Sequence, residues 1–312
     1  MGLRLSTGRW TPGFHPPVVP TAAAPADDRC MTNDKAISVR GLRKQYRDVT
    51  AVDGIDLDIH PGEIFALLGP NGAGKTTTVE ILEGHRPRTA GDVLVLGEDP
   101  QRAGRDWRAR LGIVLQDATD ARELQVDEVV THFARYYPQA RRPAEVLALV
   151  GLAEHARRKV RLLSGGQRRR LDVAVGIVGR PRLLFLDEPT TGFDPQARRQ
   201  FWDLVRRLSD DGTTILLTTH YMEEAEALAD RVAVIAQGRL VADGTPATLG
   251  GRARALTTVS WLDDGHPRQA STDEPGVVVG ELIARYGTDV PGLTVTRPTL
   301  EDVYLDLIGQ KS

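Results

Sequence analysis

The pattern of apolar and polar residues divides most of the chain into short strands and helices. Uniformly apolar or β-branched runs are typical of strands buried on both faces of a sheet, and they occupy Ile64–Leu68, Ile113–Leu115, Leu183–Leu186 and Thr214–Thr219. Alternating runs are typical of half-buried strands, and they occupy Ile37–Leu42, Val49–Val52, Ile55–Ile59 and Gly91–Leu96. Asp53-Gly54 predicts a hairpin turn between two of these. We therefore expect a mainly parallel sheet with a small antiparallel layer beside it.

Helical spacing of apolar residues follows several of the predicted strands. The predicted helices are Thr77–Glu83, Val126–Tyr136, Ala144–Leu152, Arg168–Val178, Gln196–Leu208 and Met222–Ala229. The stretch from Asp117 to about Leu162 is rich in arginine and largely helical, which predicts a helical subdomain over about 117–180. Val232–Ala236 and Arg239–Ala242, joined through Gln237-Gly238, predict a closing hairpin.

The pattern is weaker at both ends of the chain. After Gly244 it predicts strands at Thr257–Leu262, Val277–Val279 and Leu293–Thr296, and helices at Glu281–Tyr286 and Leu300–Ile308. Thr299 is the expected cap of the last helix. Residues 1–34 are rich in proline and have no periodicity, which predicts a disordered tail; Met31 leaves the true start open. We expect a tail over 1–34, a core over 35–246 and an α+β appendage over 247–312.

Composition excludes several classes of protein. The 312-residue chain has a net charge of −2 and one cysteine, Cys30. The charge gives no sign of a nucleic-acid or anionic-membrane partner, and one cysteine excludes a disulfide framework. No apolar run approaches the roughly 20 residues that span a bilayer, and the start of the chain lacks the apolar part of a secretory signal. We expect a cytoplasmic protein that reaches a membrane only through a partner.

A glycine-rich loop after the strand Ile64–Leu68 carries the strongest chemical signal. The loop matches the phosphate-binding pattern G-x-x-x-x-G-K-[ST] and consists of Gly69, Pro70, Asn71, Gly72, Ala73, Gly74, Lys75, Thr76 and Thr77. Its backbone N–H groups and the following helix N-terminus favour an anionic phosphate. Lys75 would reach the β- and γ-phosphates, and the Thr76 hydroxyl would bind Mg²⁺. A plain turn does not call for a Lys-Thr pair.

Several weaker signals follow along the chain. Leu163-Ser-Gly-Gly-Gln167 is a second glycine-rich turn before a helix, although Ser164 could serve there only as a helix cap. Asp187-Glu188 ends a buried strand, where two carboxylates are costly unless a cation or catalysis uses them. His220 follows another strand. Tyr46 could stack on a base, but alone it is better explained as an ordinary half-exposed tyrosine.

Taken together and in order, these motifs resemble the ATP-binding subunit of ABC transporters from about Ala36 to Gly244. The resemblance implies a P-loop NTPase core that binds ATP and Mg²⁺. Tyr46 would then stack on the adenine, and Gly69–Thr77 would be the Walker A loop. Asp187 would hold Mg²⁺, and Glu188 would be the general base, or at least the group that orients the attacking water. His220 would contact the γ-phosphate and position Glu188 and the attacking water.

The resemblance also implies partners. Gln116 would touch Mg²⁺ and report the nucleotide state to a membrane protein. The signature loop would close over the γ-phosphate held by the opposite subunit through Ser164, Gly165, Gly166 and Gln167, and Asp194 would connect the two sites. The chain has one Walker A loop and one signature loop, so two copies must meet, with ATP between them.

A finer resemblance concerns the cargo. Leu163–Pro195 and the ending Arg297–Gly309 are similar to the ATPases of drug and antibiotic exporters typified by daunorubicin resistance, which pair with a separate ABC-2-type permease at the inner face of the membrane. The main alternative is a soluble ABC ATPase that acts on ribosomes or DNA, but the chain has neither a second ATPase unit nor a long coiled-coil insert. A nucleotide-binding regulator without turnover would not need Glu188.

Overall fold

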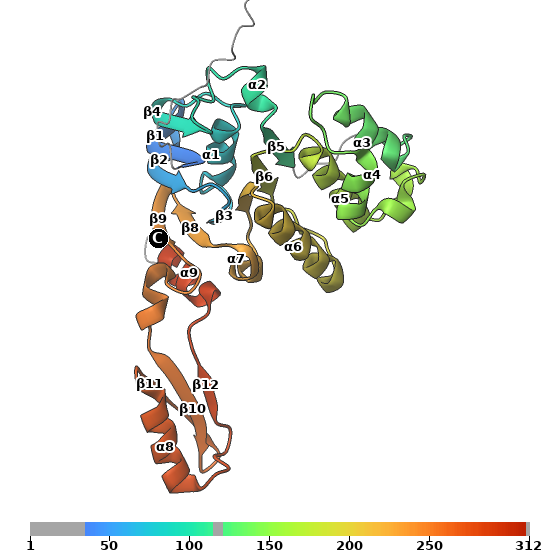
Figure 1. Cartoon of the computed structure of the whole chain (residues 1–312). Helices are drawn as coiled ribbons and strands as arrows, with labels where there is room; N and C mark the ends of the chain where they lie inside the picture. Colours follow the sequence, from blue (N-terminus) through green and yellow to red (C-terminus); the bar gives the residue numbers. More distant parts are fainter. Residues whose placement is uncertain (1–34, 115–120, 310–312) are drawn as a thin grey trace, which may run out of the picture. The chain divides into compact units, whose positions relative to one another are not determined.

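The computed structural model describes residues 35–114 and 121–309 (Figure 1). The predicted tail over 1–34 and the Gln116 site lie outside these residues, and the division into a core and an appendage stays a prediction. No helix within the described ranges is long and apolar enough to cross a bilayer.

A six-stranded sheet forms the centre of the core. Its strands, in spatial order, are β5 (Leu111–Val114), β6 (Leu183–Asp187), β7 (Thr214–Thr218), β3 (Ile64–Leu68), β8 (Arg231–Ala236) and β9 (Arg239–Gly244). The ladders from β5 to β8 are parallel, and only β8–β9 is antiparallel. The predicted parallel sheet and its closing hairpin are therefore confirmed.

Both faces of this sheet are covered, as the uniformly apolar strands predict. Within β3, Ile64, Ala66 and Leu68 belong to one buried cluster, whereas Phe65 and Leu67 belong to another. Because successive side chains of a strand point to opposite faces, one short apolar strand supplies both cores. This burial holds the carboxyl ends of the parallel strands, and the loops that follow them, at one edge of the sheet.

The second layer is the antiparallel sheet β2 (Val49–Ile59), β1 (Ile37–Tyr46) and β4 (Ala90–Val95). The predicted hairpin at Asp53-Gly54 is wrong, because β2 is one continuous strand. Leu42 pairs with Ile55 and Arg43 pairs with Asp53, so Gly54, at φ +76°, is the extra residue of a β-bulge. Glycine and a preceding Asp suit a bulge as well as a turn, which is why the sequence pattern was ambiguous.

Apart from the helix at Arg105–Arg108, which the sequence did not predict, the helices follow the predicted positions closely. They are α1 (Lys75–Leu82), α2 (Arg105–Arg108), α3 (Val126–Ala134), α4 (Pro143–Leu149), α5 (Gly165–Ile177), α6 (Pro195–Asp210) and α7 (Met222–Leu228), with the 3₁₀ turns η1 (Ala153–His155) and η2 (Val160–Leu162). Helices α3, α4 and α5 contact one another and contribute to one of the two clusters on the central sheet. The predicted helices between core strands are thus present.

The C-terminal segment contains η3 (Leu249–Arg254), β10 (Thr257–Asp263), β11 (His266–Thr272), α8 (Pro275–Tyr286), β12 (Thr294–Thr296) and α9 (Leu300–Gly309). Strands β11, β10 and β12 form an antiparallel sheet. The predicted strand at Val277–Val279 is wrong, because these residues lie in α8. Leu282 of α8 packs with Val259 of β10, so burial of one helical face overrides the strand preference of the valines.

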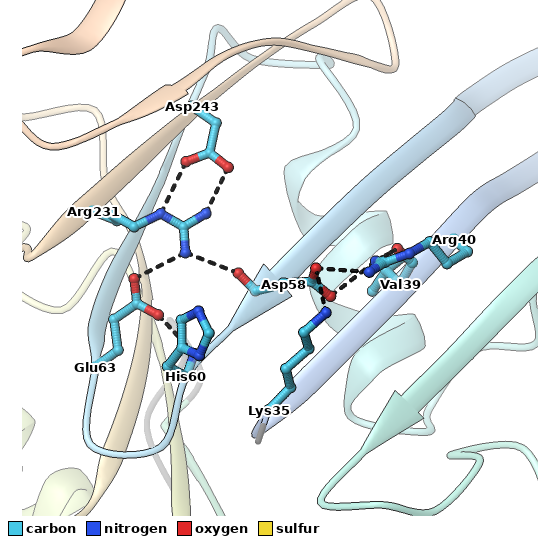
Figure 2. Close-up of polar contacts among 8 residues, drawn as sticks. All are labelled: Lys35, Val39, Arg40, Asp58, His60, Glu63, Arg231 and Asp243. Atoms are coloured by element: carbon cyan, nitrogen blue, oxygen red, sulfur yellow. Dashed lines mark hydrogen bonds and ion pairs between the residues drawn. The ribbon is translucent and has the colours of Figure 1, made fainter. Parts of the chain in front are cut away.

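A network of ion pairs lies at the amino ends of β3 and β8 (Figure 2). The Arg231 guanidinium contacts Glu63 at 3.1 Å, Asp243 at 2.6 Å and the backbone carbonyl of Asp58 at 3.1 Å. The Asp58 carboxylate in turn accepts hydrogen bonds from Lys35 and Arg40. The network therefore joins β2, an edge strand of the antiparallel layer, to the central sheet.

Candidate phosphate-binding site

The glycine-rich loop lies between β3 and α1, as the motif requires. Gly74 caps α1 at φ +105°, a left-handed conformation that favours glycine. A Cβ on Gly74 would also lie 2.4 Å from the carbonyl oxygen of Ala51. Both the conformation and the lack of space therefore demand glycine here. The result is a loop whose N–H groups and helix N-terminus can together bind an anion.

Lys75 is folded back over this loop. Its Nζ donates to the carbonyl oxygens of Gly69 at 2.6 Å and Pro70 at 3.1 Å, and the residue is only 8% exposed. Burial lowers the pKa of Lys75, while the nearby carboxylates of Glu188 and Asp187 oppose that change. A buried cation that donates its hydrogen bonds to carbonyl oxygens is suited to an added anion.

Asp187 and Glu188 lie at the carboxyl end of β6. Thr218, which pairs with Asp187 across the sheet, donates its hydroxyl hydrogen to the Asp187 carboxylate. The Glu188 N–H donates to the Thr218 carbonyl at 3.1 Å, with the Thr218 hydroxyl oxygen 3.2 Å away. Glu188 has φ +43°, an uncommon conformation for a residue with a side chain. Thr218 thus holds the Asp187 carboxylate and the backbone of Glu188 in place.

His220 completes the group. Its Nδ1 lies 3.3 Å from Glu188 Oε1, and its side chain is 46% exposed. One pocket of about 630 Å³ contains the loop, the carboxylates and this histidine. Its lining residues are Ala51, Gly69, Pro70, Asn71, Gly72, Gly74, Lys75, Thr76, Thr77, Asp187, Glu188, His220 and Tyr304. The structure therefore brings together residues that the sequence placed in one site.

The signature loop is built as a helix cap. Ser164 Oγ accepts from the Gln167 N–H at 3.2 Å, and Gln167 Oε1 accepts from the Ser164 N–H at 3.0 Å, which is a capping box on α5. The Gln167 Nε2 also lies 2.8 Å from Nε2 of His155. His155 was not singled out from the sequence, because its partner is on another element. It fixes the orientation of the Gln167 amide.

Among the described residues, Ala73 of the glycine-rich loop and three further predicted groups do not line this pocket. Tyr46 lies at the end of β1, with the ammonium of Lys44 4.8 Å from its ring centre. Asp194 caps α6 by accepting from the Ala197 N–H at 2.8 Å. The signature loop at the start of α5 is absent from the lining, and Gln116 lies outside the described residues. Their predicted roles stay predictions.

Two further residues support the site and were missed at the sequence level. Thr218 was recognised only as part of a strand. Arg169, in α5, is 8% exposed and donates to the carbonyl oxygens of Asp187 at 2.5 Å and Pro189 at 3.2 Å. It therefore ties α5 to the end of β6. An arginine that bonds distant carbonyls leaves no local pattern, so only the three-dimensional structure reveals it.

The chemistry of these donors fits a nucleotide phosphate with Mg²⁺. Among the described residues there is no cluster of three or more histidine, cysteine or carboxylate side chains that could hold a metal. The Thr76 hydroxyl and the Asp187 carboxylate line one pocket. Magnesium commonly binds one or two protein oxygens together with phosphates and water. The arrangement can therefore bind a phosphate chain, share a cation with it and offer Glu188 as a base.

Comparison with known proteins agrees with this chemistry. The family model described as "ABC transporter" matches residues 52–191. The daunorubicin resistance ATP-binding protein DrrA3 of Streptomyces coeruleorubidus is 38% identical, over 88% of this chain and 96% of its own length. The Nod factor export ATP-binding protein I of Ralstonia nicotianae is 39% identical, over 88% of this chain and 94% of its own length.

A solved structure gives the same result for the fold. The chain superimposes on CbiO1 of Clostridium perfringens, described as part of the ABC transporter complex CbiONQ, with a TM-score of 0.62 and 28% identity. The match covers 69% of this chain and 90% of CbiO1. The likeness in sequence thus extends over 88% of the chain, while this likeness in structure covers 69% of it.

Proposed function

Because this chain belongs to the family of ATP-binding subunits of ABC transporters, we propose that its phosphate pocket binds Mg·ATP and that hydrolysis there drives an exporter. The single observation that carries the proposal is the pocket itself. It combines a buried lysine on a glycine-rich loop with two carboxylates and a histidine. This is the set of groups that phosphoryl transfer to water uses.

Each residue has a defined task in this mechanism. The loop N–H groups and Lys75 bind the phosphates and oppose the negative charge of the transition state. Thr76 and Asp187 would hold Mg²⁺, which supplies further charge neutralisation when bound. Glu188 accepts a hydrogen bond from the attacking water and then its proton. His220 holds the Glu188 carboxylate and contacts the γ-phosphate, and Gln116 would touch the cation.

A second copy of the chain completes the site. The signature loop offers an N-terminal helix end, yet it does not line the pocket of its own chain. Ser164, Gly165, Gly166 and Gln167 would therefore close over the γ-phosphate of a partner's ATP, and Asp194 would connect the two sites. Tyr46 would stack on the adenine. ATP favours the closed dimer because it binds both copies, and hydrolysis favours separation.

The partner is a separate ABC-2-type permease, with the ATPase held at the inner face of the membrane. The relatives are named for daunorubicin resistance and for Nod factor export, which supports export of drugs, antibiotics or other hydrophobic compounds. The described part of the chain has no helix that could cross the bilayer. A permease would therefore supply the path for the cargo.

The substitution Glu188→Gln tests the ATPase dimer. It removes the base and keeps the shape of the side chain, so we expect ATP turnover to fall by about 10³-fold while ATP still binds. An ATP-bound dimer should accumulate, which size-exclusion chromatography with light scattering measures. Glu281→Gln, on an exposed position of α8, is the matched control and should behave like the unaltered chain. A Glu188→Gln variant that stays monomeric at saturating ATP would rule out the proposed dimer with ATP bound between its two copies.

Purification from native membranes tests the exporter. The tagged chain should co-purify with a polytopic membrane protein that mass spectrometry identifies. Ribosomal proteins or DNA-repair factors without any membrane protein would instead indicate a soluble ABC ATPase.

A further inference from the structure

The last helix of the chain is anchored on the ATPase core at its first turn. Leu300 is fully buried in the same cluster as the core strands β3, β6 and β7. The Leu300 N–H lies 3.3 Å from Glu226 Oε1 of α7, and that oxygen also lies 2.5 Å from Nη1 of Arg252. Arg252 Nε donates to the carbonyl oxygen of Pro298 at 2.8 Å. The start of α9 is therefore fixed from two sides.

The register of α9 is fixed as well. Thr299 and Asp302 bond each other's backbone N–H groups at 2.8 and 3.1 Å, which caps the helix. Leu300 and Val303 are buried, and Tyr304 lies one helical turn after Leu300 on the same face. Tyr304 itself packs against the core cluster. Its position is thus set by the anchored helix.

This position brings Tyr304 to the phosphate pocket. Tyr304 lines the pocket together with Lys75, Glu188 and His220. Every other lining residue comes from β2, the glycine-rich loop with the start of α1, or the ends of β6 and β7. The last helix therefore contributes a tyrosine to this pocket. Nothing in the sequence position of Tyr304 predicts that contribution.

The chemistry of the phenol suits a phosphate. Burial raises the pKa of the Tyr304 hydroxyl, so the group keeps its proton at neutral pH and can donate it in a hydrogen bond. The pocket already holds two carboxylates, and a neutral donor adds no negative charge beside the phosphates. A hydroxyl donor to a charged acceptor forms a stronger hydrogen bond than a neutral pair does.

We propose that Tyr304 is a nucleotide-binding residue, whose hydroxyl donates to the terminal phosphate of ATP bound in the same chain. This inference rests on the proposed function, because Glu188 and His220, which share the pocket, are assigned there to the γ-phosphate end. It follows that α9 is sensitive to the nucleotide state. By linkage, ATP stabilises the docked helix to the same extent that the docked helix increases the affinity for ATP.

The substitution Tyr304→Phe tests the hydrogen bond while keeping the ring. The full chain is titrated with fluorescent ATP and ADP, with Mg²⁺ present and under conditions without turnover. We expect the affinity for ATP to fall about tenfold, the value of one hydrogen bond to a charged group, with little change for ADP. Tyr286→Phe is the matched control, because the Tyr286 hydroxyl donates to Asp263 in the C-terminal segment and Tyr286 does not line the pocket. Its nucleotide affinities should be unchanged.

Hydrogen exchange gives a second measurement that a simple loss of packing would not reproduce. A non-hydrolysable ATP analogue should slow amide exchange in α9 of the unaltered chain, and this protection should be weaker in Tyr304→Phe. The amides of α8 serve as the internal reference.

Different outcomes overturn different statements. Unchanged ATP affinity in Tyr304→Phe, or equal weakening of ATP and ADP, would overturn the assignment of Tyr304 to the terminal phosphate and leave the proposed function intact. Failure of the unaltered chain to bind ATP would overturn the proposed function and this inference together.

Discussion

Charged side chains have different partners at the two ends of the central sheet. At the amino ends of β3 and β8, Arg231 is matched by Glu63 and Asp243, and Asp58 by two cations (Figure 2). At the carboxyl ends, Lys75 donates to backbone carbonyls and Asp187 accepts from a hydroxyl. The charged groups at the amino end are therefore paired with one another. At the carboxyl end, Lys75 and Asp187 are hydrogen-bonded to neutral groups and can still bind a charged ligand.

The difference shows how one sheet serves stability and chemistry at once. Paired charges at the amino end hold the antiparallel layer against the core, and they depend on no ligand. At the carboxyl end, burial lowers the pKa of Lys75. The charged ammonium therefore costs the folded protein free energy, which an added anion would offset. Substitutions at the two ends should thus affect different measurements.

Lys75→Ala should have the largest effect, on function alone. Loss of the cation removes a charge that stabilises the phosphates, so we expect turnover to fall by about 10³-fold, or about 4 kcal/mol in the activation barrier. Affinity for ATP should fall as well. The free energy of unfolding, measured with urea in the absence of nucleotide, should change by less than about 1 kcal/mol, because the buried ammonium is poorly compensated. A variant with normal ATP binding and turnover would remove Lys75 from the site.

Arg231→Met should show the reverse pattern. It leaves Glu63, only 8% exposed at its side chain, without its cation, so the free energy of unfolding should fall by about 3 kcal/mol. Affinity of the folded fraction for ATP should be unchanged. Arg239→Met is the control, since the Arg239 pair with Asp53 is two-thirds exposed on the arginine side and should contribute about 1 kcal/mol or less. If Arg231→Met weakens ATP binding but not stability, the contrast between the two ends fails.

Glu83→Gln should change how stability depends on pH. Burial, with smaller contributions from Asp187 and Glu80, raises the pKa of Glu83 from 4.5 to about 8. Between these values the folded state binds more protons than the unfolded state, so this residue makes stability fall as the pH rises from about 4.5 to about 8. Glu83→Gln should remove that fall, whose size is set by the pKa difference at about 1.4 kcal/mol per pKa unit. Urea unfolding at several pH values measures it.

Asp58→Asn is the matched substitution at the amino end of the sheet. The pKa of Asp58 is shifted in the opposite direction to that of Glu83, so its effect on stability has the opposite pH dependence. Arg40 and then Lys35 hold the pKa of Asp58 down to about 2 against its ordinary 3.8, despite some opposing burial. Its stabilisation is complete above about pH 3.8 and is lost as the pH falls through about 2. Asp58→Asn should therefore lower stability by about 1 kcal/mol at neutral pH. The comparison would be contradicted if the difference in unfolding free energy between Glu83→Gln and the unaltered chain did not change with pH. A gain in stability from Asp58→Asn would contradict it as well.

The predictable part of the fold is the part that local patterns encode. Apolar strands, capped helices and the glycine-rich loop were correct within a few residues because their signals lie within one short stretch. Gly54 shows the limit, since Asp-Gly suits a turn or a bulge, and only pairing with β1 decides. The valines at 277–279 are another, because packing on β10 selects helix. β11 has no alternating pattern, since most of its side chains are exposed.

The candidate site divides in the same way. Four site residues were predictable because each ends or follows a strand of a parallel sheet, and the carboxyl ends of such strands meet at one edge. They are Lys75, Asp187, Glu188 and His220. Thr218, Arg169 and Tyr304 were not predictable. Their contributions depend on contacts across the sheet, from α5 and from α9, and nothing in their immediate sequence announces a partner.

The contact between Gly74 and Ala51 has a mechanical consequence. A methyl group on Gly74 would lie 2.4 Å from the Ala51 carbonyl oxygen, and one on Gly238 would lie 2.9 Å from the same atom. The phosphate loop, β2 and the β8–β9 turn therefore meet without clearance for a single extra carbon. Because there is no clearance at this junction, a movement of β2 toward the loop would displace the loop as well. The nucleotide site therefore behaves as one rigid unit with β2. Larger movements during a transport cycle must come from elements that are packed less tightly.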